Sequence, residues 1–237
     1  MLVTALLTGR GNNSLKDKNI IKVAGKPVLY YPANAAKNCR KINNWFCSSD
    51  DEKILALAQE IGYEKIVRPN ELAQPDSQHI DCILHALQHL HSKNIDPDIL
   101  VVLLANNVTI KSQWITECID KILENQSVSA VVPVYVDNDH HPFRAKKINK
   151  DGFLIPYEDN IPKTVSTNRQ DLTKSFFLAH NFWVLNVKNV LKGEAGQPPW
   201  SFMGNKILPY IIKESMDIHT ISDLIIAKEW LNNNYVD

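Results

Sequence analysis

Short apolar runs rich in β-branched residues alternate along this chain with longer segments in which apolar residues recur every three or four positions. The short runs indicate buried strands, and the longer segments indicate helices with one buried face. The predicted strands are residues 2–8, 45–48, 65–67, 99–104 and 128–136, and the predicted helices between them are residues 28–36, 52–61, 80–91 and 113–123. This alternation predicts an α/β fold with a mostly parallel sheet flanked by helices.

The alternation breaks after residue 136. Residues 137–142 are polar, and residues 143–173 mix proline, glycine and charged residues without a helical period. We expect about 137–176 to be a small inserted antiparallel region, within an otherwise single domain, that serves in dimer contacts or as a lid. Regular structure returns at residues 177–185 and 207–212, and an amphipathic last helix is predicted from about 222 to 231.

Composition narrows the function classes. The 26 Lys plus Arg residues balance the 26 Asp plus Glu residues, whereas a nucleic-acid backbone or an anionic membrane favours a basic surface, so neither is expected as a partner. No apolar run approaches the roughly 20 residues that span a bilayer, and no secretory leader is recognisable. The four cysteines form no C-x-x-C pair, which favours reduced thiols in a cytoplasmic protein.

A glycine-rich, cationic loop follows the first predicted strand and reads TGRGNNSLKDKN over residues 8–19. Glycines let main-chain N–H groups approach phosphate oxygens, and Arg10, Lys16 and Lys18 can neutralise several negative charges. The segment nearly matches the dinucleotide pattern G-x-G-x-x-G, but residues 18–23 read as extended where that pattern needs a helix. The loop therefore fits a triphosphate, and a polar surface turn is the alternative.

Three segments lie in the order found in one enzyme family. Residues 68–73 read RPNELA, residues 217–223 read DIHTISD, and Gly11, Leu15, Lys18 and Asn19 align without a gap to a loop pattern A-R-x-G-S-K-G-[IL]-P-x-K-N, with Arg10 one residue late. With these segments the sequence resembles the acylneuraminate cytidylyltransferases, or CMP-sialic acid synthetases. The resemblance spans most of the chain and implies a Rossmann-like nucleotidyltransferase fold and a homodimer.

The resemblance implies that an acceptor hydroxyl attacks the α-phosphorus of CTP and releases pyrophosphate. Such transfers depend on positioning and on neutralising phosphate charge, so Arg10, Lys18 and Asp217 are the catalytic candidates. The residues that the resemblance places against the nucleotide are Thr8, Gly9, Gly11, Asn12, Asn19, Arg68, Ser77 and His79.

The resemblance also implies Mg²⁺, with Asp217 and Asp223 as its candidate ligands. His219 replaces the family's second metal carboxylate, and imidazole is a poor ligand for a hard ion. Either Asp223 or water completes the site, or the use of metal has changed. The alternative for the two aspartates is a turn after a strand and a charge at a helix start.

The acceptor end departs furthest from the family. Its Q-P-T-S-P-L-R is ANNVTIK at residues 105–111, and its N-G-x-x-Y is HNFWV at residues 180–184. The candidate acceptor-binding residues are Arg144, Arg169, Gln170 and Trp200. The expected acceptor is a 2-keto-3-deoxy sugar acid of the sialic-acid type. The alternatives are a phosphate or phosphonate acceptor, or a nucleotide-binding scaffold without catalysis.

Arginine is scarce in this chain, with only five residues. Four of them, Arg10, Arg68, Arg144 and Arg169, fall inside the segments assigned above to nucleotide or acceptor. We therefore expect the positive charge of the protein to be concentrated in one cleft.

Overall fold

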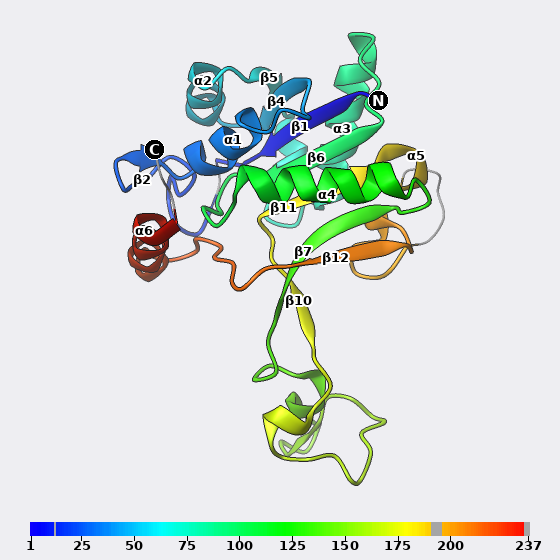
Figure 1. Ribbon diagram of the computed structural model, residues 1–237. Helices are drawn as coiled ribbons and strands as arrows, with labels where there is room; N and C mark the ends of the chain where they lie inside the picture. Colours follow the sequence, from blue (N-terminus) through cyan, green and yellow to red (C-terminus); the bar gives the residue numbers. More distant parts are fainter. Residues whose placement is uncertain (12, 191–195, 235–237) are drawn as a thin grey trace.

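The computed structural model describes residues 1–11, 13–190 and 196–234 and is built around one mixed sheet (Figure 1). The order of the strands is β10-β7-β11-β6-β1-β4-β5, with β12 also paired to β7. Their bounds are β1 Val3–Thr8, β4 Asn44–Ser49, β5 Glu64–Val67, β6 Ile99–Leu104, β7 Ala130–Val136, β10 Phe176–Leu178, β11 Phe182–Asn186 and β12 Ile207–Ile211. All run parallel except β10 and β11, which confirms the mostly parallel α/β prediction.

Helices cover both faces of the sheet. They are α1 Tyr30–Lys37, α2 Glu52–Glu60, α3 His79–Ser92, α4 Ser112–Glu124, α5 Val187–Val190 and α6 Ile221–Asn234, with short 3-10 turns η1 Asn70–Leu72, η2 Pro142–Arg144, η3 Arg169–Asp171 and η4 Ser201–Met203. None of the described helices has both the length and the apolar character needed to cross a membrane.

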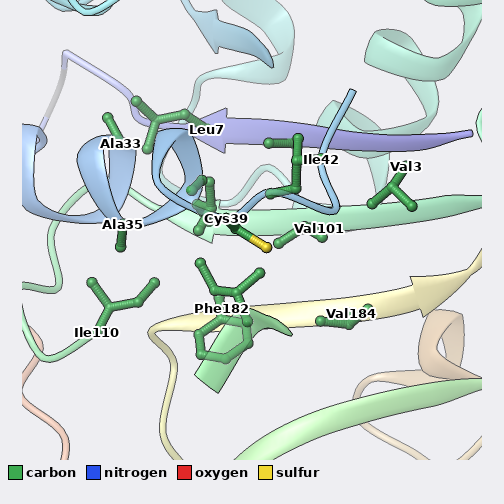
Figure 2. Packing of buried hydrophobic residues seen from close by; sticks show 14 of the residues in the cluster. Val3, Leu7, Ala33, Ala35, Cys39, Ile42, Val101, Ile110, Phe182 and Val184 are labelled. Atoms are coloured by element: carbon green, nitrogen blue, oxygen red, sulfur yellow. The ribbon is translucent and has the colours of Figure 1, made fainter. Parts of the chain in front are cut away.

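Alternation along the strands divides the core into two layers. In β6, Val101 and Leu103 pack with α1, α2 and α4, whereas Leu100 and Val102 pack with α3 and the segment around η4. Figure 2 shows residues of the first layer from close by, among them Phe182 of β11 and Ala33 and Ala35 of α1. A third cluster joins α6 to the hairpin of β2 Lys22–Val23 and β3 Lys26–Pro27. Both faces of β6 are therefore buried, as a central parallel strand requires.

Residues 137–175, which we call the arm, project away from the sheet on the extended ends of β7 and β10 (Figure 1). The arm contains a small antiparallel hairpin, β8 Lys146–Ile148 with β9 Leu154–Pro156. Its exposed apolar side chains include Ile148, Phe153, Leu154 and Tyr157. The chain returns through Phe176, which pairs with Val136 at the point where the arm leaves.

Candidate functional site

A cavity of about 270 Å³, which we call the main cavity, lies at the carboxyl ends of the parallel strands β1 and β6, where open α/β sheets bind ligands. It is lined by Thr8, Gly9, Arg10, Asn13, Lys18, Asn19, Arg68, Leu72, Gln74, Pro75, Ser77, Gln78, His79, Cys82, Leu104 and Asn106. The structure therefore brings together most of the residues predicted to touch the nucleotide. Gly11 and Asp217 do not line the cavity, and Asn12 lies outside the described residues.

The loop after β1 packs against Asp50 and Asp51, which directly follow β4. The Gly11 N–H donates to Asp50 Oδ1 at 3.0 Å, and a Cβ on Gly11 would lie 2.8 Å from Asp51 Oδ2, so a larger residue does not fit. Asn19 Nδ2 donates to the Arg10 carbonyl at 3.0 Å and closes the loop. Gly11 thus acts in this structure by letting the loop pack against Asp51.

Arg10, Lys18 and Arg68 line this cavity with positive charge, and Asp217 is the carboxylate whose charge acts on Lys18. Arg68 is 7% exposed and donates to Ser48 Oγ at 3.2 Å and to the Ser48 carbonyl at 2.7 Å. Arg10 donates to the Gln74 carbonyl at 2.6 Å. Among the ion pairs of the described residues, none includes these three side chains.

Burial lowers the pKa of Lys18 and the Arg10 charge lowers it further, whereas Asp217 opposes the shift. A buried cation is costly unless it is paired. The positive charge of the cavity consequently favours the binding of an anion.

His79 supplies a neutral imidazole to the same cavity. Thr8 Oγ1 donates its proton to the Leu103 carbonyl at 3.2 Å, so it accepts from His79 Nε2 at 3.1 Å, which fixes the tautomer. Burial, followed by the charges of Arg68 and His180, lowers the pKa of His79 to about 4. Its ring centroid lies 4.9 Å from that of Trp183. His79 can therefore donate to a ligand only through rearrangement of the Thr8 bond.

Ser77, predicted to touch the nucleotide, also shapes the cavity wall. Its Oγ donates to the Glu71 carbonyl at 3.0 Å and accepts from the Gln74 N–H at 2.9 Å. These bonds hold the turn after η1, so that Gln74 lies where Arg10 can donate to it.

Asp217 lies beside the cavity, with its backbone bridged to Asn107. Asn107 Nδ2 donates to Asp217 Oδ1 at 2.9 Å, and His219 Nε2 lies 3.7 Å from Asp217 Oδ2. Burial raises the pKa of Asp217, while the Asn107 hydrogen bond and the charges of His180, His219 and Lys18 oppose that rise. The carboxylate thus faces mostly positive or donating groups.

Asp223 has a different role in the structure. Its Oδ2 accepts from the N–H groups of His219 at 2.8 Å and Thr220 at 2.7 Å, at the start of α6. This is a helix-capping arrangement, which was the alternative for this residue. The described residues contain no cluster of three or more His, Cys, Asp or Glu side chains that could hold a metal ion.

A magnesium ion bound mainly by phosphate oxygens and water needs only one or two protein carboxylates. Asp217 fits that requirement, because its Oδ2 makes no hydrogen bond among the described contacts. Asp223 fits it less well, since one of its oxygens is already used in the cap.

The predicted acceptor-binding residues divide between two places. Arg144 and Arg169 lie in the arm and both pair with Asp139, the former at 3.2 Å, and Gln170 lies beside them in η3. Trp200 instead packs on His180, with ring centroids 5.2 Å apart, and lines an apolar cavity of about 250 Å³. The expectation of one cationic cleft is therefore wrong within a single chain. Of the four arginines expected in it, Arg10 and Arg68 line the main cavity, whereas the other two lie in the arm.

Three neighbours of the site were missed from sequence. Asn106 lines the cavity and Asn107 contacts Asp217, and their position directly after a predicted strand could have indicated both. His180 has φ of +47° and is near enough to Asp217 and His79 to change their pKa values. His180 belongs to the segment at residues 180–184 that was compared with the family's acceptor end, but its place beside Asp217 depends on β11 folding back between β6 and β7.

Comparison with known proteins gives a consistent result. A family model described as cytidylyltransferase matches residues 10–151. A pseudaminic acid cytidylyltransferase of Campylobacter jejuni is 26% identical over 222 residues, covering 92% of this chain and 90% of that protein. An N-acylneuraminate cytidylyltransferase of Streptococcus agalactiae is 24% identical over 219 residues, covering 91% of this chain and 49% of that protein.

A solved structure of CMP:2-keto-3-deoxy-manno-octonic acid synthetase complexed with CTP superimposes with a TM-score of 0.69. The match covers 98% of this chain and 99% of that one at 12% sequence identity, and so it shows a shared fold.

Proposed function

Because the chain belongs to the cytidylyltransferase family and is thus a nucleotidyltransferase, we propose that it transfers CMP from CTP to a sugar acid of the 2-keto-3-deoxy type. The observation that carries the proposal is the cavity lined by Arg10, Lys18 and Arg68, none of which forms an ion pair with a carboxylate among the described residues. Unpaired cations of this kind favour a triphosphate. The relatives named above act on pseudaminic or acylneuraminic acid, which supports a sugar acid as acceptor.

In the proposed reaction, the acceptor hydroxyl oxygen forms a bond to the α-phosphorus of CTP, the bond to the pyrophosphate oxygen breaks, and the hydroxyl proton is released. Arg10 and Lys18 neutralise the charge that develops on the phosphate oxygens. Arg68 fixes the nucleotide with its planar set of donors. A bound triphosphate raises the pKa of Lys18 again and so holds its ammonium group in the charged form.

We propose Mg²⁺ as the metal of this reaction. Asp217 Oδ2 would hold it together with phosphate oxygens and water, and the ion would neutralise phosphate charge. Asp217 itself would bind and orient the ion, and Asn107 and Lys18 oppose the rise in its pKa that burial causes.

We further propose that the protein is a homodimer built through the arm. Ile148, Phe153 and Leu154 are 72%, 67% and 73% exposed, which is unusual for a hairpin that stands apart from the core. Arg144, Arg169 and Gln170 would then serve the acceptor carboxylate of their own chain or of the partner. Trp200 would line the acceptor side from within its own chain.

Pyrophosphate release tests the reaction. We expect turnover with CTP, Mg²⁺ and at least one of sialic, legionaminic, pseudaminic and octulosonic acids, and much slower turnover with UTP. Turnover only with phosphate or phosphonate acceptors would contradict the sugar-acid proposal. Binding of CTP without turnover of any acceptor would instead indicate a nucleotide-binding scaffold.

Light scattering after size-exclusion chromatography tests the dimer. We expect Leu154→Asp to give a monomer, because a charge enters the apolar face of the arm. Ile226→Asp is the matched control, since Ile226 is also exposed, at 51%, but lies on α6. Monomeric wild-type protein, or equal dissociation of both variants, would contradict the arm as the interface.

A further inference from the structure

A buried polar network lies behind the main cavity and joins three segments that are distant in sequence. Asn107 and Thr109 follow β6, Ala179 and His180 lie between β10 and β11, and Ser215 follows β12. Asn107 and Thr109 are fully buried, each with 0% exposure. Buried polar groups need hydrogen-bond partners, so such a network holds its members in one arrangement.

The orientation of the Asn107 amide follows from its neighbours. The Thr109 N–H can only donate, and it lies 2.9 Å from Asn107 Oδ1, with the Thr109 hydroxyl donating to the same oxygen. The amide nitrogen, Nδ2, therefore points away from Thr109. It lies 2.9 Å from Asp217 Oδ1 and 2.9 Å from Ser215 Oγ.

Ser215 Oγ donates to the Ala179 carbonyl and so accepts from Asn107. The two protons of the Asn107 amide have Ser215 Oγ and Asp217 Oδ1 as their nearest acceptors, at 2.9 Å each, and the carbonyls of Ala179 and His180 lie farther away at 3.3 Å. The proton directed at Asp217 is accepted by Oδ1, which leaves Oδ2 without a hydrogen bond among the described contacts.

The backbone restrains Asp217 in the same place. Asn107 and Asp217 form an isolated antiparallel bridge, and the Ile218 N–H donates to the Asn106 carbonyl at 3.0 Å. Asn106 itself lines the cavity. The Asn107 side chain and the backbone of the segment around it thus both restrain Asp217.

We infer that Asn107 is a positioning residue of the transfer reaction, which holds Asp217 Oδ1 so that Oδ2 is left for the metal and substrate. The inference rests on the proposed function, because it assigns Asp217 a part in the reaction. Asn107 itself is fully buried and does not line the main cavity. Its contribution is the direction in which a neighbouring carboxylate points.

Asn181 offers a matched control within the same region. It is also 0% exposed, its Nδ2 donates to the Thr109 carbonyl at 2.8 Å, and its Oδ1 accepts from the Phe182 N–H. Among the described contacts it makes no hydrogen bond to Asp217. Loss of either amide removes buried hydrogen bonds, but only loss of Asn107 releases the carboxylate.

The experiment compares Asn107→Ser and Asn107→Asp with Asn181→Ser and Asn181→Asp. We expect both Asn107 variants to lower kcat about 10- to 100-fold, as loss of a hydrogen bond to a charged group implies. The Asn181 variants should keep kcat within about threefold after correction for the folded fraction, which thermal unfolding measures for every variant. Asn107→Asp preserves side-chain volume, whereas Asn107→Ser adds no charge, so either variant that folds is decisive.

Calorimetry supplies a second readout that does not depend on turnover. CTP is titrated into each variant with and without Mg²⁺. We expect the gain in CTP affinity caused by Mg²⁺ to be lost in the Asn107 variants and retained in the Asn181 variants, while affinity without Mg²⁺ stays unchanged in both pairs.

Equal losses of kcat and of the Mg²⁺ effect in both pairs would overturn the inference and leave the proposed function standing. A wild-type protein that binds no CTP would contradict the proposed function itself. The two failures are therefore distinguishable.

Discussion

The main cavity and the arm hold arginines in opposite electrostatic settings. In the cavity, Arg68 is 7% exposed, and among the described residues it donates to the neutral acceptors of Ser48. In the arm, the side chains of Arg144 and Arg169 are 42% and 54% exposed and both pair with Asp139. The difference teaches that residue type alone does not identify an anion site. A guanidinium marks such a site when it is buried and its charge is not already compensated.

Lys18→Met should produce the largest effect in the cavity. We expect kcat/KM for CTP to fall about 100- to 1000-fold, because a buried cation facing the phosphates is removed. Steady-state kinetics measure the loss. Lys16→Met is the matched control, since Lys16 lies in the same loop but is exposed and does not line the cavity. Similar losses in both variants would show that total loop charge matters, and would break the contrast.

Acidification should destabilise the cavity region through His79. The pKa of His79 is lowered from 6.5 to about 4 in the folded protein, so the unfolded chain binds more protons between those values. The contribution of neutral His79 to the free energy of unfolding should therefore be fully present above about pH 6.5. It should be lost as the pH drops toward 4, which lowers the free energy of unfolding by at most about 3 kcal/mol. Denaturant unfolding at a series of pH values measures this fall.

His79→Gln should remove that part of the pH dependence, because glutamine does not titrate. His91→Gln, which replaces an exposed histidine at the end of α3, should leave it in place. An unchanged slope in His79→Gln would mean that another group takes up the proton.

Arg68→Lys should have a smaller effect than loss of the Lys18 charge. We expect CTP affinity to fall about 10-fold, because an ammonium group cannot reproduce the planar donors that bind both Ser48 and a ligand. Calorimetry with CTP measures the change. Arg40→Lys is the control, since Arg40 is exposed and outside both regions. If Arg68→Lys binds CTP with the affinity of the wild-type protein, the positive charge of this residue matters and its planar donors do not.

Arg144→Gln and Arg169→Gln should have the smallest effects. Exposed ion pairs contribute roughly 0–1 kcal/mol, so the free energy of unfolding should change by less than about 1 kcal/mol and CTP affinity should not change. Denaturant unfolding and calorimetry measure the two quantities. A large loss of CTP affinity in either variant would show that the arm reaches a nucleotide site, and the contrast between the two regions would fail.

Much of the fold could be predicted because it depends on local pattern. Strand β6 has the bounds predicted from the apolar run, residues 99–104, and the match to the cytidylyltransferase model confirms the predicted family and enzyme class. The segment at residues 177–185 contains two strands, β10 and β11, because the chain turns at His180 with a positive φ that histidine rarely adopts. The antiparallel direction of β11 also cannot be read from periodicity, which is the same in either direction.

The candidate site was predictable where the chemistry is contiguous with a strand end, as in the loop from Thr8 to Asn19. It was not predictable where residues meet through tertiary folding. Arg144 and Arg169 carry the right charge, but the path of the arm decides where they lie. Asp223 has the right carboxylate, but the start of α6 uses it as a cap. The metal and acceptor roles of these residues stay predictions.

The two ends of the arm are adjacent, since Val136 pairs directly with Phe176. A segment whose entry and exit are neighbouring strand positions can be exchanged without altering the path of the chain on either side. A short hairpin turn could replace residues 137–175, and a longer insertion could occupy the same position. This junction therefore makes the arm a replaceable segment, so that the dimer and acceptor roles proposed for it can be exchanged while the sheet stays intact.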